Sequence, residues 1–130
     1  MTVKDFRELR VYKSGFESAV QIHEATKRFP VEERYSLTDQ IRRSSRSVCA
    51  NIAEAWRKRR YPNHFVSKLS DALAEATETI VWLDFSFHFG YLSKEIQQKL
   101  IEHYELICKQ LSLMMDHPEQ WTPKQDKDAK

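Results

Sequence analysis

The stretch from Ser36 to Arg60, SLTDQIRRSSRSVCANIAEAWRKRR, most constrains what this chain can fold into, because its pattern predicts one long helix. Residues three and four apart lie on the same face of a helix, so residue types that recur at this spacing define its faces. The apolar face consists of Leu37, Ile41, Ser45, Val48, Ile52 and Trp56. An amphipathic helix of this kind owes most of its stability to packing against other helices.

A second face of this helix is entirely polar. We predict that it forms a hydrogen-bonded network together with Glu75 from a later helix. The predicted members on this face are Gln40, Ser44, Ser47, Asn51 and Glu54. Because an unpaired buried polar group costs about 1–3 kcal/mol, the favoured interpretation is a network that fixes the register of the helices. A binding pocket and a catalytic or metal site are the two alternatives.

Three further helices are predicted at about 8–28, 63–89 and 93–115, beside the helix at 36–59. The first has the apolar residues Leu9, Tyr12, Phe16 and Val20 at helical spacing. Breaks are expected at Phe29-Pro30 and Tyr61-Pro62, because the residue before a proline disfavours the α conformation. Gly90 is expected to end the third helix in a left-handed conformation, and Ser93 to cap the fourth.

Few glycines and prolines, two and four in 130 residues, favour long regular elements with short connections. We therefore predict an all-α fold, an antiparallel up-down-up-down four-helix bundle over residues 1–115. Residues 116–130 are expected to be a flexible tail, although Trp121 is a candidate for docking on the bundle. No run of about 20 apolar residues is present, and the first ten residues are too charged for a signal peptide, so we expect a cytoplasmic protein without membrane association.

Charge is unevenly distributed along the chain. The net charge of the whole sequence is +2, but residues 34–60 contain eight basic and two acidic side chains, a net charge of +6. The basic residues of the long helix and its end are Arg42, Arg43, Arg46, Arg57, Lys58, Arg59 and Arg60. We predict that they contact phosphates of RNA or DNA, with Trp56 and Tyr61 available to stack on unpaired bases. The alternative is a solvated basic face that interacts with the helix dipole or with acidic groups of the protein.

The motifs of common enzyme and metal sites are missing from the sequence. It has no Cys-x-x-Cys, HExxH, P-loop, GxGxxG or nucleophile elbow, and no Glu is followed three residues later by His, as di-metal bundles require. Cys49 and Cys108 are isolated and are expected to be free thiols. The sequence therefore predicts no catalytic residue, no metal site and no cofactor.

The third predicted helix has more aromatic residues than one core-facing stripe needs. Trp82, Phe85 and Phe89 share a second face at three-to-four spacing. Apolar side chains on the surface of a monomer mark sites of association. We predict that this face and the helix at 36–59 mediate self-association.

The sequence resembles the four helix bundle protein family, whose founding members are encoded in intervening sequences of bacterial large-subunit ribosomal RNA genes. The similar positions are Phe6, Leu9, Val11, Tyr12, Phe29, Pro30, Glu33, Leu37, Thr38, residues 40–44, Ser47, Val48, residues 50–54, residues 73–75 and residues 90–92. The resemblance covers about residues 5–115 and includes polar as well as apolar positions. The sequence departs from the usual family pattern at Ala55 and at Asp71-Ala72, where glycine and a glycine-serine pair are more common.

This resemblance implies a bundle that assembles into a ring, typically a homopentamer. It also implies a more distant similarity to the accessory protein of diversity-generating retroelements, which engages nucleic acid. Two functions therefore stay open at this point. The first is a non-enzymatic ring that binds nucleic acid or accompanies an RNA-protein complex. The second is a structural or protein-interaction oligomer without nucleic-acid contact, whose arginines form ion pairs between subunits.

Overall fold

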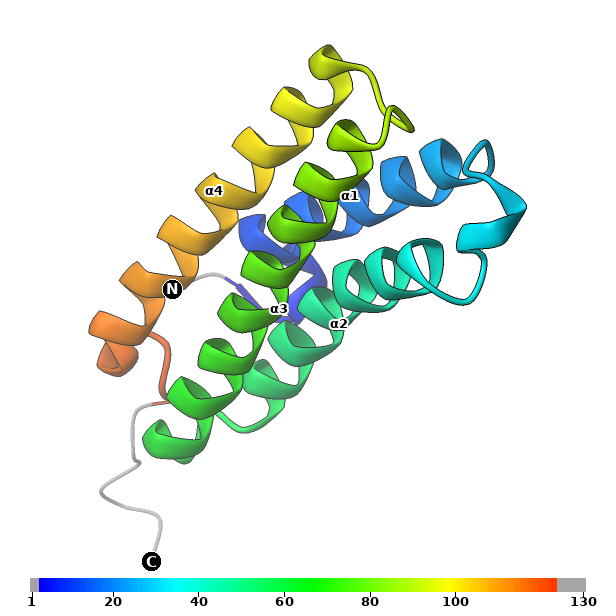
Figure 1. The fold of residues 1–130 in the computed structure, drawn as a ribbon. Helices are drawn as coiled ribbons and strands as arrows, with labels where there is room; N and C mark the ends of the chain where they lie inside the picture. The colour runs from blue at the N-terminus through cyan, green and yellow to red at the C-terminus, as the bar shows by residue number, and fades with distance from the viewer. Residues whose placement is uncertain (1–2, 124–130) are drawn as a thin grey trace, which may run out of the picture.

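The computed structural model describes residues 3–123, which contain helices and no strand. Four α-helices form the bundle, and three short 3-10 helices flank or connect them (Figure 1). The α-helices are α1 (Arg10–Thr26), α2 (Leu37–Arg57), α3 (Pro62–His88) and α4 (Lys94–Asp116). The 3-10 helices are η1 (Phe6–Glu8), η2 (Val31–Glu33) and η3 (Pro118–Gln120).

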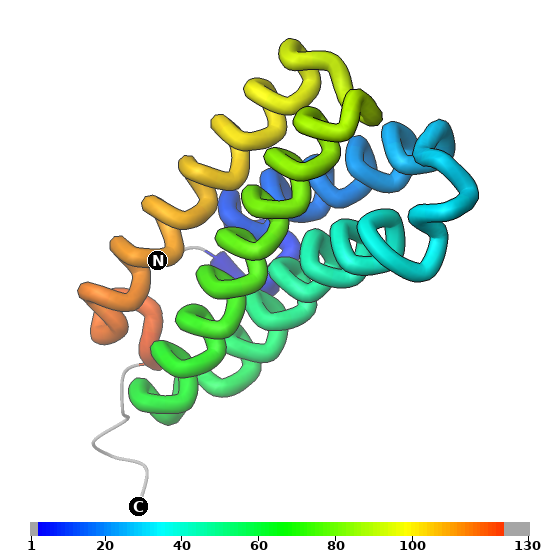
Figure 2. Tube along the Cα trace, viewed as in Figure 1, coloured from blue at the N-terminus to red at the C-terminus, as the bar shows by residue number. Residues whose placement is uncertain are grey.

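The helices follow one another around the bundle, as the trace of the chain shows (Figure 2). Each α-helix contacts the next along the chain, and α1 also contacts α4. Within residues 3–123, no Cα atoms of the two diagonal pairs, α1 with α3 and α2 with α4, lie within 8 Å of each other. This confirms the predicted four-helix bundle and places α1 and α3 at opposite corners.

The predicted helix boundaries lie within two residues of the observed ones, because the residues that end each helix are local signals. Gly90 has a φ of 82°, the left-handed conformation expected for it. The Tyr91 N–H donates to the Ser86 carbonyl at 2.8 Å, which closes the end of α3. The Ser93 side chain accepts a hydrogen bond from the Ile96 N–H and caps α4 as predicted.

The apolar face of α2 is buried as predicted. Its members and those of the other helices pack into one continuous core. The largest fully buried side chains include Ile41, Ile52, Phe65, Leu69, Leu83, Leu100, Tyr104, Ile107 and Leu111. The core therefore lies along the whole length of the bundle and holds α2 and α3 side by side.

The predicted apolar face of the first helix is wrong in part. Phe16 and Val20 are 53% and 48% exposed, whereas the small residues Gly15 and Ser18 are buried. A Cβ atom at residue 15 would lie 3.3 Å from the Cys49 Sγ atom. Small side chains allow α1 to approach α2 closely, so the larger residues on the neighbouring face point outward.

The sequence predicted a flexible tail from residue 116 onward. The structure instead continues with regular elements beyond that residue. Helix α4 includes Asp116, and the 3-10 helix η3 follows it. Trp121 is half-buried and packs against the core, as its isolated position in a polar segment suggested. The remainder of the predicted tail, residues 124–130, lies outside the described residues.

The buried thiol of Cys49 predicts a specific loss of stability at alkaline pH. Burial raises the pKa of this thiol to about 11, whereas an exposed thiol titrates near pH 8.5. Above about pH 8.5 the unfolded state loses this proton first, so the free energy of unfolding falls until pH passes the folded pKa. The total loss is about 3 kcal/mol. Urea unfolding of wild type and Cys49→Ala at pH 7.5, 9 and 10.5 measures how the free energy of unfolding changes with pH. If this free energy fell equally with pH in the two proteins, the prediction would be contradicted.

Candidate nucleic-acid interface

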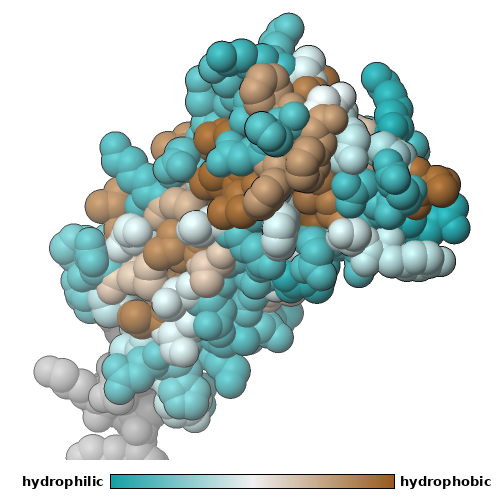
Figure 3. Space-filling view, viewed as in Figure 1, coloured by the Kyte–Doolittle hydropathy of each residue, from teal (hydrophilic) through white to brown (hydrophobic). Residues whose placement is uncertain are grey.

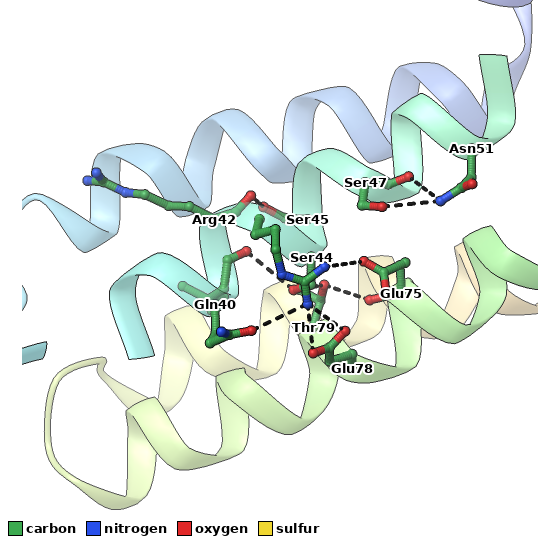
Figure 4. Close-up of polar contacts among 11 residues, drawn as sticks. Gln40, Arg42, Ser44, Ser45, Ser47, Asn51, Glu75, Glu78 and Thr79 are labelled. Atoms are coloured by element: carbon green, nitrogen blue, oxygen red, sulfur yellow. Dashed lines mark hydrogen bonds and ion pairs between the residues drawn. The ribbon is translucent and has the colours of Figure 1, made fainter. Parts of the chain in front are cut away.

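The predicted polar face of α2 meets α3 through two separate contacts (Figure 4). The first is an ion-pair cluster around Arg43. Its guanidinium group lies 3.1 Å from a Glu75 carboxylate oxygen and 2.9 Å from a Glu78 carboxylate oxygen. It also donates to the side-chain carbonyl of Gln40 at 3.3 Å. These carboxylates raise the pKa of Arg43, and they neutralise a charge that the sequence assigned to phosphate binding.

The second contact is buried. The hydroxyl groups of Ser44 and Thr79 lie 2.8 Å apart, and the Thr79 hydroxyl donates to the Glu75 carbonyl at 2.8 Å. Both side chains are fully buried, so this contact fixes the register of α2 against α3. Thr79 was not predicted as a member of the polar contact, although its position continues the spacing of Ala72, Ala76 and Leu83 on the core face.

The remaining predicted members of the network do not join these contacts. The Asn51 side-chain amide donates to the carbonyl and the hydroxyl of Ser47 within α2. Glu54 is exposed and pairs with Lys68 at 2.8 Å. The polar face therefore forms four local arrangements along α2 and not a single network, because residues at its two ends are too far apart to share partners.

Arg42 and Arg46 connect α2 with the end of α1. The Arg42 Nε group donates to the Thr26 hydroxyl at 2.7 Å, and its Nη2 group donates to the His23 carbonyl at 3.4 Å. The Arg46 Nη2 atom lies 3.1 Å from the His23 Nδ1 atom. The carbonyl end of α1 attracts cations, so these two arginines have a structural function within the chain.

In the part of the chain that the structure describes, the basic residues at the end of α2, residues 57–60, do not bond to α1 or α3 as the earlier arginines do. Arg57, Lys58 and Arg60 are exposed, and within residues 3–123 no acidic side chain forms an ion pair with them. The Arg59 guanidinium group stacks 3.7 Å from the centre of the Trp56 ring and donates to the Trp56 carbonyl at 2.8 Å. Partial burial and the nearby charge of Arg57 lower the pKa of Arg59.

A cleft of about 310 Å³ lies where α2 turns into α3. It is lined by Arg57, Arg59, Arg60, Tyr61 and Pro123. The Tyr61 ring is 58% exposed and lies 5.7 Å from the His64 ring. We call residues 57–61 the basic corner, which combines four positive charges with an aromatic ring that solvent reaches.

The structure brings the three predicted interface residues together on the last turns of α3 and at its C-cap, and we call Trp82, Phe85 and Phe89 the aromatic patch. The ring centres of Trp82 and Phe85 lie 6.1 Å apart, and those of Phe85 and Phe89 lie 5.8 Å apart. Phe85 and Phe89 are about half exposed. In the space-filling view, apolar side chains gather over α3 and α4 within a largely hydrophilic surface (Figure 3).

Among residues 3–123, no three His, Cys, Asp or Glu side chains lie close enough together to hold a metal ion. None of the helices in this part of the chain has the length and apolar content that crossing a bilayer requires.

Taken together, the fold and these surfaces define a small all-helical bundle protein with a polar contact between α2 and α3 and a basic corner. Residues 7–113 match the model of the 23S rRNA-intervening sequence protein family, and the chain belongs to this family. A crystal structure of a protein of unknown function, from the S23 ribosomal protein family of Bacteroides thetaiotaomicron, is also similar. The two chains are 31% identical with a TM-score of 0.73, over 82% of this chain and 95% of the other. No curated protein matches the chain.

Proposed function

We propose that the protein is a non-enzymatic, ring-forming helical bundle that binds nucleic acid through its basic corner. The observation that carries this proposal is a contrast between two groups of basic residues. The earlier arginines of α2 bond to α1 or α3, whereas the exposed side chains of Arg57, Lys58 and Arg60 form no hydrogen bond or ion pair within residues 3–123. Arg43 is neutralised by two glutamates, and Arg42 and Arg46 bond to α1. The residues from Arg57 to Arg60 have no acidic partner within residues 3–123.

Physical reasons favour a nucleic acid as the partner of this corner. Lysine and arginine side chains release the counterions condensed on phosphates, which makes binding favourable and dependent on salt. The exposed Tyr61 ring offers a face on which an unpaired base stacks, a contact worth about 1–3 kcal/mol. The description of the family refers to 23S rRNA intervening sequences, so structured RNA with unpaired loops is the first ligand to test.

Self-association is the second part of the proposal. The aromatic patch leaves apolar area in water that a second copy would cover. We propose a ring, a homopentamer as the family resemblance implies, in which each copy contributes one basic corner. Repetition of the four positive charges of the basic corner around a ring strengthens the field that attracts a polyanion.

A salt titration tests the nucleic-acid part directly. Fluorescence anisotropy with a labelled RNA hairpin and a labelled DNA duplex, between 50 and 400 mM salt, gives the affinity at each step. The affinity should fall steeply with salt, with a slope of about −0.7 to −0.9 in log–log units per phosphate contacted. Light scattering on the same samples gives the number of subunits. A well-formed oligomer that binds neither probe would favour the alternative, a structural or protein-interaction oligomer.

A further inference from the structure

A second apolar surface lies on α1, diagonally across the bundle from α3. It is a groove between α1 and α2 with a volume of about 370 Å³. Its apolar lining consists of Tyr12, Phe16, Ala19 and Val20, and we call it the α1–α2 groove. The Tyr12 and Phe16 rings lie 6.0 Å apart, so the groove has an aromatic wall.

The exposure of this groove has a cause in the packing of α1. The helix approaches α2 through Gly15 and Ser18, which are small and buried. That arrangement turns Phe16 and Val20 outward, about half exposed, within a single helical turn of each other. Two large apolar side chains next to a hollow form a surface that a protruding apolar group from another molecule fits.

The aromatic patch has the complementary shape and charge. Phe85 on α3 and Phe89 at its C-cap leave 45% and 51% of their area exposed, whereas the groove is a hollow. Glu78 lies one turn before Trp82, and the cluster of Glu75, Glu78 and Arg43 has a net charge of −1. The rim of the groove contains Arg46 and His23, so its charge is positive. Complementary rims fix the orientation of two docking surfaces.

We infer that the aromatic patch of one copy docks into the α1–α2 groove of the next copy, head to tail. This inference rests on the self-association proposed above and names the surface that receives the patch. The two surfaces lie on α1 and on the C-terminal part of α3, and these helices occupy diagonal corners with no Cα atoms within 8 Å of each other in the described chain. A two-fold contact of the patch with itself would leave the groove uncovered, whereas a head-to-tail contact covers both in every copy of a ring.

Mixing two variants tests the head-to-tail contact. The patch variant is Phe85→Gln with Phe89→Gln, and the groove variant is Phe16→Gln with Val20→Gln. All four side chains are about half exposed and glutamine suits helices, so both variants should fold, which circular dichroism checks. Each variant alone should be a monomer by light scattering at about 50 μM, where wild type assembles.

An equimolar mixture of the two variants should form a dimer and nothing larger. The intact patch of the groove variant docks into the intact groove of the patch variant. No third subunit can add, because the substitutions have removed the groove of the first variant and the patch of the second. A matched control, Leu106→Gln with Leu113→Gln on α4, changes two equally exposed apolar side chains and should assemble like wild type.

Three results would overturn the inference. They are a monomeric wild type, a groove variant that still assembles, and a mixture of folded variants that stays monomeric. The nucleic-acid proposal is judged separately, because both variants keep the basic corner. Salt-dependent RNA binding by the two monomers measures that corner whether or not the mixture forms a dimer.

Discussion

Replacing Arg57, Lys58 and Arg60 together with alanine should weaken RNA binding at 50 mM salt by roughly two orders of magnitude. These three side chains are exposed, so the variant removes charge without opening the core. Arg59 is left in place because its stack on Trp56 contributes to packing as well as charge. Loss of three phosphate contacts should also reduce the salt slope by about 2. Anisotropy titrations at several salt concentrations measure both quantities.

The control for this variant removes the same number of charges elsewhere. Lys13, Lys94 and Lys109 are exposed on α1 and α4, and their replacement with alanine should change the affinity by no more than about threefold, through net charge alone. Arg43→Ala is a second control, because two glutamates already neutralise this arginine. Equal losses in the corner variant and the lysine variant would show that the corner has no special function.

The fold was predictable from the sequence because its determinants are local and repetitive. The residues of the predicted apolar face of α2 recur at helical spacing, and all of them are buried. The helix ends are fixed by single residues such as Gly90 and Ser93, whose capping hydrogen bonds need no tertiary partner. Four amphipathic helices with short connections then have few ways to bury their apolar faces.

The face of α1 was not predictable in the same way. Its large residues, Phe16 and Val20, have helical spacing as good as that of the residues that are buried. The outcome depends on how closely α1 approaches α2, and that distance is set by Gly15 against Cys49. Hydropathy alone does not contain this information, because it scores large apolar residues as core residues and overlooks close packing of small ones.

The site was predictable as a set of residue types and not as a set of contacts. The sequence places the polar residues of α2 on one face, but their partners on α3 depend on the register of two helices. Arg43 stood among the basic residues in the sequence, and only the structure places it between Glu75 and Glu78. Thr79 was overlooked because a threonine among apolar residues has no partner until Ser44 is placed opposite.

Replacing Phe65 with alanine should have the largest effect on stability, a loss of about 3–5 kcal/mol in the free energy of unfolding. Phe65 is 1% exposed and lies in the first turn of α3, where its N–H donates to the Tyr61 carbonyl at 2.9 Å. A buried phenylalanine loses its transfer free energy on truncation and also leaves a cavity that the rigid neighbouring helices fill only in part.

The matched change is Phe87→Ala near the other end of α3, where the side chain is 37% exposed. It removes the same atoms from a site that water already reaches, so it should cost about 1–2 kcal/mol. Urea unfolding of both variants at pH 7.5 measures the difference. Equal losses would contradict the assignment of Phe65 to the core. Domains of this size are typically stable by about 5–15 kcal/mol, so Phe65→Ala should remove a large share of the total and unfold first on heating.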